Sequence, residues 1–408
     1  MTFKAFSHVT QAARGRRPAR GDQNGADQNT ADQAHADQNT ADQAHADRDG
    51  ADQGRADLAG TDRARADRGS RGRWRSAVRW ETGLAVALVA VIIFGNAETP
   101  EFLHPTTFFY VGINMGYLAI MALPLTLIIV TGEIDLSVAS MLSLSGAVMG
   151  ELFAHHWPVW PAMVAALAVG LVGGALNGLL VARFGLPSIA VTIGTMTLFE
   201  GAAEIVLGTS TVTGFPNSLT QVGVAPIAGT ELSWSAGIFL VLAIAFGLTL
   251  HATPAGRSIF AMGLQPEAAQ FAGIRVRRIK FTLFVLSGLV SAFAGILLTL
   301  QNASVSYDVG NSLALNVVVL VLFGGVSIFG GRGTIVGVVL SVAVIGCLQQ
   351  ALTQMQVQPY AQYIVMGALL LISIVLPGGG ETVRRLRSGA RWRRAPAPQL
   401  SPSPRGPA

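Results

Sequence analysis

The sequence predicts an all-α polytopic membrane protein with about ten transmembrane helices. Apolar residues make up 51% of its 408 residues and charged residues only 12%. The mean hydropathy is +0.49 even though the chain begins with a long polar segment. Basic residues are sparse between Glu81 and Gly380, and five of the seven in that stretch fall in one loop. These patterns are typical of membrane helices joined by one arginine-rich cytoplasmic loop.

The first 80 residues predict a disordered, low-complexity cytoplasmic tail. Aspartate recurs every five residues from Asp22 to Asp67. A β-solenoid with this period would need an inward-facing apolar side chain in each repeat, but Leu58 is the only large one in the repeat. Disorder is therefore favoured over a solenoid. Residues 379–408 form a second predicted cytoplasmic tail, which is basic and rich in proline.

The body of the chain, residues 81–378, predicts a transmembrane domain. A bilayer core needs about 20 apolar residues per helix, and the first and third runs are candidates for re-entrant or tilted segments. The predicted spans lie near 83–97, 109–131, 135–153, 160–182, 187–208, 234–252, 281–300, 313–330, 334–352 and 360–376. If the N-terminus is cytoplasmic and the number of spans is even, every basic residue of the body lies on the cytoplasmic side. We therefore expect a multi-pass membrane protein with both termini in the cytoplasm.

Several chemical functions have no motif in this chain. It lacks a phosphate-binding G-x-x-x-x-G-K-[ST] loop, and its only lysines are Lys4 and Lys280. It also lacks HExxH, paired cysteines and a nucleophile elbow. These absences predict a protein that is not an enzyme and holds no metal or cofactor. The net charge of +5 lies in the juxtamembrane ends, which predicts contact with anionic lipid rather than nucleic acid.

The basic loop predicts a short helix that couples the body to another protein. Pro266 suits a first helical position, Glu267 suits the first turn, and Gly273 suits the end. The predicted surface is small enough to fit a groove of a partner and comprises Ala268, Ala269, Phe271 and Ala272. The alternative is an amphipathic segment lying on lipid headgroups.

Polar residues within the spans are candidates for a translocation pathway, because such residues normally face the interior of a bundle. Asp135 can instead cap the third span together with Ser137. Glu200 and Glu204 share one helix face near an outer end, where a solvated entrance is favoured over a proton relay. Hydroxyl groups suit a neutral polyol, although each residue alone could form a helix-to-helix bond. The pathway candidates are Asn114, Asp135, Asn177, Thr192, Thr195, Thr197 and Asn316.

Three segments resemble the permeases of ribose-type bacterial ABC importers. They are TGEIDLSVASMLSLSGAVMG at 131–150, the loop around Glu267-Ala268-Ala269, and LFGGVSIFGGRGTIVGVVL at 322–340. Within that group, ALPLTLIIVTGEIDLSVAS and ARFGLPSIAVTIGTMTLF are most similar to rhamnose permeases, with autoinducer-2 permeases next. Two positions depart from the pattern. Gly263-Leu264-Gln265 replaces the usual Gly-Gly-Asn, and Glu133 replaces a glycine.

The resemblance implies a permease subunit of the bacterial inner membrane, with residues 81–378 as its permease domain, that imports a monosaccharide such as rhamnose. It implies cytoplasmic ATPase subunits that hydrolyse the ATP, an extracytoplasmic sugar-binding protein, and a second permease chain that makes a homodimer or heterodimer around the pathway. The alternatives are an autoinducer-2 or branched-chain amino-acid permease, a secondary transporter and a membrane enzyme. The resemblance assigns the ATPase-coupling loop to Arg257, Gly263, Glu267, Ala268, Ala269 and Gly273.

Overall fold

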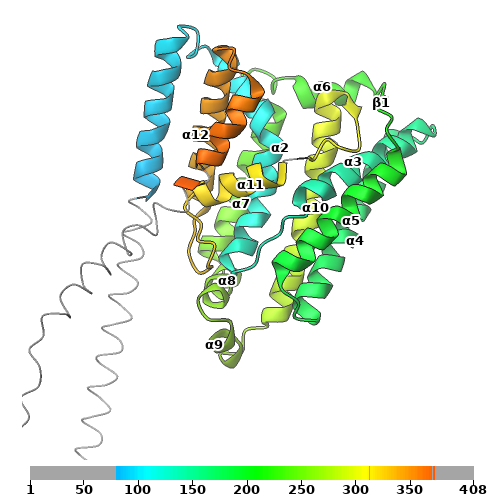
Figure 1. Cartoon of the computed structure of the whole chain (residues 1–408), viewed down its shortest axis with the longest axis vertical. Coiled ribbons are helices and arrows are strands. Elements are labelled where there is room, and N and C mark those ends of the chain that lie inside the picture. Colours follow the sequence, from blue (N-terminus) through cyan, green and yellow to red (C-terminus); the bar gives the residue numbers. More distant parts are fainter. Residues whose placement is uncertain (1–79, 312, 370, 373–408) are drawn as a thin grey trace, which may run out of the picture. The chain divides into compact units, whose positions relative to one another are not determined.

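The computed structural model describes residues 80–311, 313–369, 371 and 372. The predicted tails at 1–80 and 379–408 lie outside this range, except for Trp80. The described chain is a bundle of helices (Figure 1), as the sequence predicts. Seven of its helices are long and apolar enough to cross a membrane.

The first half of the bundle begins with the helix Trp80–Glu98. It continues through α2 (Pro105–Val130), α3 (Val138–Ala154), α4 (Val159–Gly178) with its π-helical extension η1 (Leu179–Arg183), and α5 (Ser188–Leu207). A two-residue strand, β1 (Val212–Thr213), and the short helix α6 (Asn217–Val224) follow.

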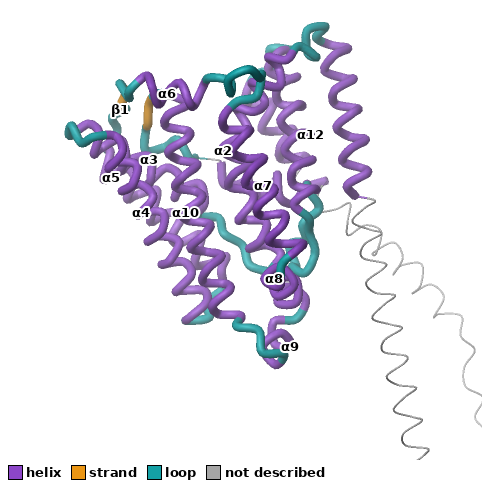
Figure 2. The backbone as a smooth tube through the Cα atoms, turned by 180° about the vertical axis from the view of Figure 1, so that it is seen from behind, coloured by secondary structure: helices purple, strands orange, loops and turns teal. Residues whose placement is uncertain are grey.

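The second half contains α7 (Trp234–Ala252), α8 (Pro254–Leu264), α9 (Pro266–Phe271), α10 (Val276–Asn302), β2 (Ser304–Val305), α11 (Leu313–Phe323) and α12 (Ile335–Gln354). A further helix starts at residue 359 and continues through 369. Strand β2 pairs antiparallel with β1. The helix α6 lies at one end of the bundle, and α8 and α9 lie at the other (Figure 2). These are called the α6 end and the α9 end below.

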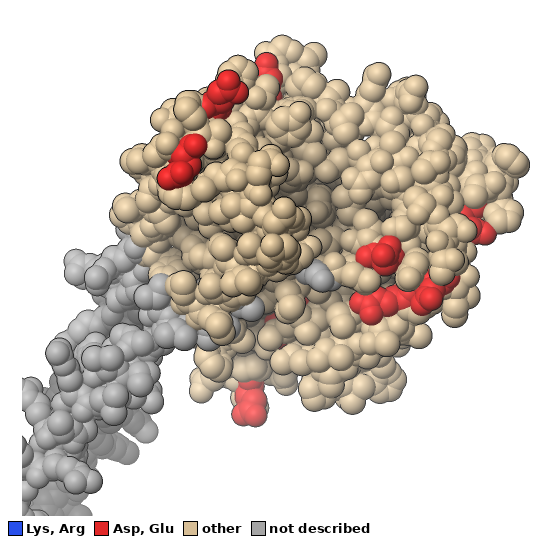
Figure 3. Space-filling view, turned by 45° about the horizontal axis from the view of Figure 1, so that its top comes forward, with Lys and Arg blue, Asp and Glu red and all other residues tan. Residues whose placement is uncertain are grey.

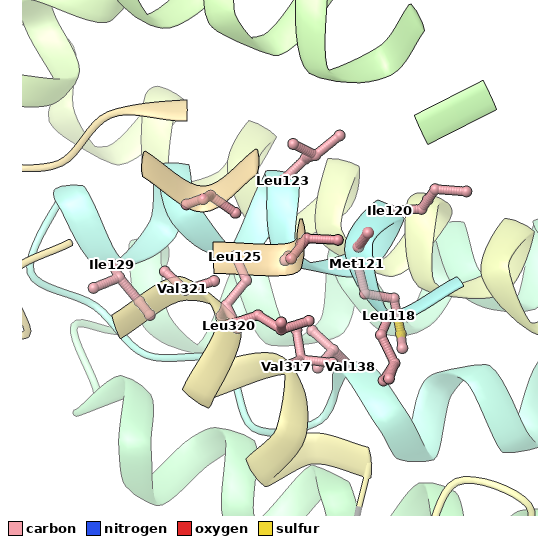
Figure 4. Close-up of a cluster of buried hydrophobic side chains, with 14 of the residues drawn as sticks. Leu118, Ile120, Met121, Leu123, Leu125, Ile129, Val138, Val317, Leu320 and Val321 are labelled. Atoms are coloured by element: carbon pink, nitrogen blue, oxygen red, sulfur yellow. The ribbon is translucent and has the colours of Figure 1, made fainter. Parts of the chain in front are cut away.

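Helix α2 forms the centre of the bundle. Its residues from 118 to 130 are all buried, and its side chains pack against those of α11 (Figure 4). The contacting apolar residues form what we call the α2–α11 cluster: Leu118, Ile120, Met121, Leu123, Leu125, Ile129, Val317, Leu320 and Val321. A helix that is apolar on every side belongs in such a core.

Glycines allow α4 and α10 to approach each other closely. Gly170 and Gly174 are one turn apart on α4, and both face Gly288 of α10. A Cβ added to Gly288 would come within 2.7 Å of the Gly174 Cα. Helices in membranes pack through such small residues because lipid supplies no hydrophobic drive for their association.

The predicted span at 313–330 is wrong in length. Helix α11 ends at Phe323 and has 11 residues, which rise only about 16 Å, too little to cross a bilayer core of about 30 Å. The chain leaves the helix at Gly325, whose φ is +85°. The Trp80 indole N–H donates to the Phe323 carbonyl at 3.0 Å and fixes this early end. The first predicted span is a full-length helix, whereas the third, α3, has 17 residues.

Candidate functional site

The loop at the α9 end has the local structure that the sequence predicts. Pro266 begins α9, Glu267 lies in its first turn, and Gly273 follows it with a φ of +83°. The preceding helix α8 was not expected as a separate element. The Thr253 hydroxyl caps α8 by accepting the Gly256 N–H at 3.3 Å, because the side chain of an N-cap residue replaces a missing helical acceptor.

The surface of α9 differs from the predicted one at a single position. Ala269 is only 4% exposed and packs in a small cluster with Met262 and Val276. The expectation that Ala269 faces a partner is therefore wrong, because this methyl group anchors α9 to its own chain. Ala268 is exposed, and the Phe271 side chain is 93% exposed. The face available to a partner thus centres on these two residues.

The three segments that carry the family resemblance meet at the α9 end. The Gly331 N–H donates to the Val130 carbonyl at 2.8 Å. A Cβ on Gly263 would overlap that same carbonyl, and one on Gly330 would lie 2.9 Å from the Gly263 carbonyl oxygen. We call these contacts among Val130, Gly263, Gly330 and Gly331 the glycine junction. It joins α8 directly to the last turn of α2.

Asp135 and Asn177 serve an internal hydrogen-bond network. The Asp135 side chain is 3% exposed and accepts from the Ser137 N–H at 3.0 Å, the Ser137 hydroxyl at 2.6 Å and the Ser287 hydroxyl at 2.8 Å. The Asn177 amide donates to the Ser137 hydroxyl at 2.8 Å. The network joins the 131–137 segment to α4 and α10. Ser137, rather than Asp135, occupies the N-cap position of α3.

Glu133, which replaces a glycine of the resembled pattern, forms an ion pair with Lys280. Both side chains are mostly buried. The pair connects the 131–137 segment to the first turns of α10. The negative charge of Glu133 is therefore neutralised by Lys280, the single lysine of the body.

The threonines on α5 make helix contacts. The Thr192 hydroxyl is placed 3.3 Å from the Ile134 carbonyl, and the Thr195 hydroxyl is 3.4 Å from the Thr192 carbonyl. Thr197 is exposed and bonds within its own helix. None of the three lines the cavity described next.

A cavity of about 410 Å³ lies among α2, α10, α11, α12 and the helix from 359 to 369. Each helix contributes residues from one face, such as Gly346, Gln349, Gln350 and Thr353 of α12 at spacings of three and four residues. Among the described residues that line it, none is charged. Its carboxamides come from Asn114, Gln301, Asn302, Asn316, Gln349, Gln350 and Gln362.

Sequence reasoning identified only Asn114 and Asn316 of this set. Gln301 lies just beyond the predicted span at 281–300, but the structure places it in the last turn of α10, where it lines the cavity. Its neighbour Gly223 of α6 would place a Cβ 2.5 Å from the Gln301 backbone, so the cavity lies toward the α6 end. The missed signal was the presence of glutamines within apolar runs, as at Gln349, Gln350 and Gln362.

The α6 end also differs from the α9 end in charge. Figure 3 shows acidic residues and a hollow on this side, with no Lys or Arg visible outside the grey atoms. Arg257 lies in α8, and Arg275, Arg277, Arg278 and Lys280 lie at the start of α10. The described body therefore has a basic α9 end and an opposite end without visible basic side chains.

A bundle of membrane helices with a neutral polar cavity at one end and an exposed two-helix loop at the other suits a transport permease. The family model for the permease component of branched-chain amino acid transport systems matches residues 107–374. The chain belongs to this family and is a multi-pass membrane protein of a transport system.

Its relatives include autoinducer 2 import system permease proteins. The protein from Klebsiella pneumoniae subsp. pneumoniae is 31% identical over 323 residues, which cover 78% of this chain and 96% of the relative. Those from Escherichia coli (strain K12) and Shigella flexneri are each 33% identical over 302 residues, which cover 72% of this chain and 91% of each relative. These relatives are transport permeases rather than enzymes.

Proposed function

We propose that this chain is the permease subunit of an ATP-driven importer and that α9 docks into a cytoplasmic ATPase subunit. One observation carries the proposal: α9 is held by its buried Ala269 while Ala268 and the 93% exposed Phe271 face away from the bundle. A large exposed aromatic residue beside small ones suits insertion into a pocket of a partner protein.

The glycine junction supports a coupling role for this loop. Gly263, at the end of α8, contacts backbone of both Val130 and Gly331. Backbone-to-backbone contact leaves no flexible side chain to absorb a displacement, so movement of α8 shifts α2 and the 327–331 turn. The N-terminal half of α2, far from Val130, lines the cavity. A motion of the ATPase would thus reach the cavity along α2.

For the solute, we propose a small neutral carbohydrate-like molecule. Two solutes fit this class: a rhamnose-like monosaccharide, favoured by the resemblance at 122–140, and autoinducer 2, named in the relatives at 31–33% identity. A branched-chain amino acid carries both an ammonium and a carboxylate group. The cavity presents no charged side chain to either group among its described lining residues, so this alternative is less well supported.

The proposed assembly contains two ATPase subunits, an extracytoplasmic binding protein and a second permease chain. We propose that both termini and the α9 end lie in the cytoplasm, because all seven basic residues of the body would then be cytoplasmic. The tails at 1–80 and 379–408 would flank the permease domain on that side and contact anionic lipid.

The test of α9 docking replaces Ala268, the exposed small residue, with arginine. A large charged side chain would clash in an ATPase groove and would leave a charge buried without a partner. We expect Ala268→Arg to lose co-purification of the ATPase and to abolish solute-stimulated ATP hydrolysis, while membrane abundance stays normal. A Phe271→Ala variant should weaken the same association by removing the aromatic contact.

The matched control is Gln221→Arg on α6, an exposed position at the opposite end, which should leave the ATPase bound. If α9 instead rests on anionic lipid, the added arginine would be tolerated or favourable. Full ATPase association and transport in Ala268→Arg would therefore disprove docking at this helix.

A further inference from the structure

We propose that the amide-lined cavity is the site where one permease chain holds the solute, and that its ligand is a neutral polyhydroxylated molecule. The inference rests on the proposed importer function and adds a defined site within a single chain to it. The volume, about 410 Å³, is within the range of roughly 300–1,000 Å³ typical of small-molecule pockets.

The polar groups of the cavity are available to a ligand. Among the described residues, no protein hydrogen bond satisfies the side-chain amide of Gln350, which is only 8% exposed. The amides of Asn316, which is partly buried, and of Asn114, which is exposed, likewise form none. The Gln301 side-chain oxygen is buried without a protein partner. Buried polar groups normally have partners, because leaving one unsatisfied costs free energy. A bound solute would supply the missing bonds.

The chemistry of carboxamides selects the class of ligand. Each amide offers an acceptor oxygen and two N–H donors, and a hydroxyl likewise both donates and accepts. Several carboxamides in one cavity therefore match several hydroxyls in one molecule, and they neither attract nor repel a charge. Tyr117 and Tyr363 also line the cavity. Their rings can cover the C–H side of a sugar while their hydroxyls reach its polar edge.

The cavity is open at the α6 end and closed toward the α9 end. Asn302, Thr353 and Tyr363 line it and are exposed, whereas Leu118 and Met366 are buried. Beyond Leu118, the α2–α11 cluster fills the centre of the bundle (Figure 4). A solute arriving from the α6 end would stop at this apolar cluster, which acts as a seal because it offers a polar solute no hydrogen bonds.

Cysteine protection tests the site directly. In a Cys347→Ala background, Asn316→Cys would be labelled with a small membrane-impermeant thiol reagent in the assembled transporter. We expect L-rhamnose or autoinducer 2 to slow this labelling at least severalfold, and L-leucine to have no effect. The matched control is Ser218→Cys, an exposed residue of α6, whose labelling should not change with any solute.

Protection by L-leucine alone, or by none of the solutes, would overturn the inference. A second variant, Gln350→Leu, removes one amide while keeping similar bulk. We expect it to lower solute uptake about tenfold, as the loss of one hydrogen bond implies, without changing ATPase co-purification. Unchanged uptake would contradict the site. Because ATPase association is read separately, failure of the cavity and failure of α9 docking are distinguishable.

Discussion

At the scale of single residues, Asp135 shows how a buried polar residue can stabilise helix packing rather than contact a solute. Its carboxylate accepts three hydrogen bonds from Ser137 and Ser287, which leaves little capacity for a passing solute. Asn114 and Asn316 have the opposite arrangement, since they line a cavity and lack protein partners among the described residues. Residue type alone could not separate these cases, because the distinction depends on which helices lie opposite.

Replacing Asp135 tests this structural role. Asp135→Ala would leave buried N–H and O–H donors without an acceptor, at a cost of about 1–3 kcal/mol for each group that finds no substitute. We expect a lower thermal unfolding midpoint of the detergent-purified transporter, with Asp135→Asn intermediate because it keeps one acceptor. If Asp135→Ala keeps the wild-type midpoint but loses uptake, the residue acts in the pathway instead.

At the scale of elements, the sequence predicted helices best where local signals agree. For α9, proline, glutamate and glycine each occupy the position they favour in a short helix, and the structure confirms it. The burial of Ala269 could not be predicted, because it depends on α9 folding back onto α8 and α10. For α11, by contrast, the sequence predicted a helix that is too long. Its apolar run continues past Phe323, but the Gly324–Gly325 turn ends the helix.

The glycine junction gives a prediction for these elements. A Cβ in Gly263→Ala would overlap the backbone of Val130 and Gly331. Helix α8 would therefore have to move away from the end of α2 and from the 327–331 turn. We expect a loss of about 1–3 kcal/mol in stability, as for other overpacked positions, and weaker coupling of ATP hydrolysis to solute. Thermal unfolding and solute-stimulated hydrolysis measure the two effects.

The control for this variant is Gly194→Ala on α5, where a Cβ would meet no atom within 4 Å. A helical glycine in open space gains from alanine, by about 0.4–1 kcal/mol. If both substitutions had the same effect, the junction would not be a tight contact between the two segments.

At the scale of the whole molecule, one asymmetry connects the sequence to the proposed mechanism. Basic residues gather at the α9 end, where a nucleotide-hydrolysing partner would dock, and the neutral cavity opens at the α6 end. The hydropathy pattern predicted the all-α membrane bundle and most helix positions. The cavity escaped prediction because its wall combines five helices that are distant in sequence, each contributing a few neutral residues.

Site-directed labelling tests this orientation. Ser218 on α6 and Gln270 on α9 are both exposed, whereas Cys347, the single cysteine of the chain, is buried. In a Cys347→Ala background, an impermeant thiol reagent added to intact cells should label Ser218→Cys, whereas Gln270→Cys should react only in inverted membrane vesicles. The physical reason is that arginine-rich loops are retained on the cytoplasmic side during insertion. Labelling of both positions from outside would reverse the assignment of the α9 end, and no cytoplasmic ATPase could then reach α9.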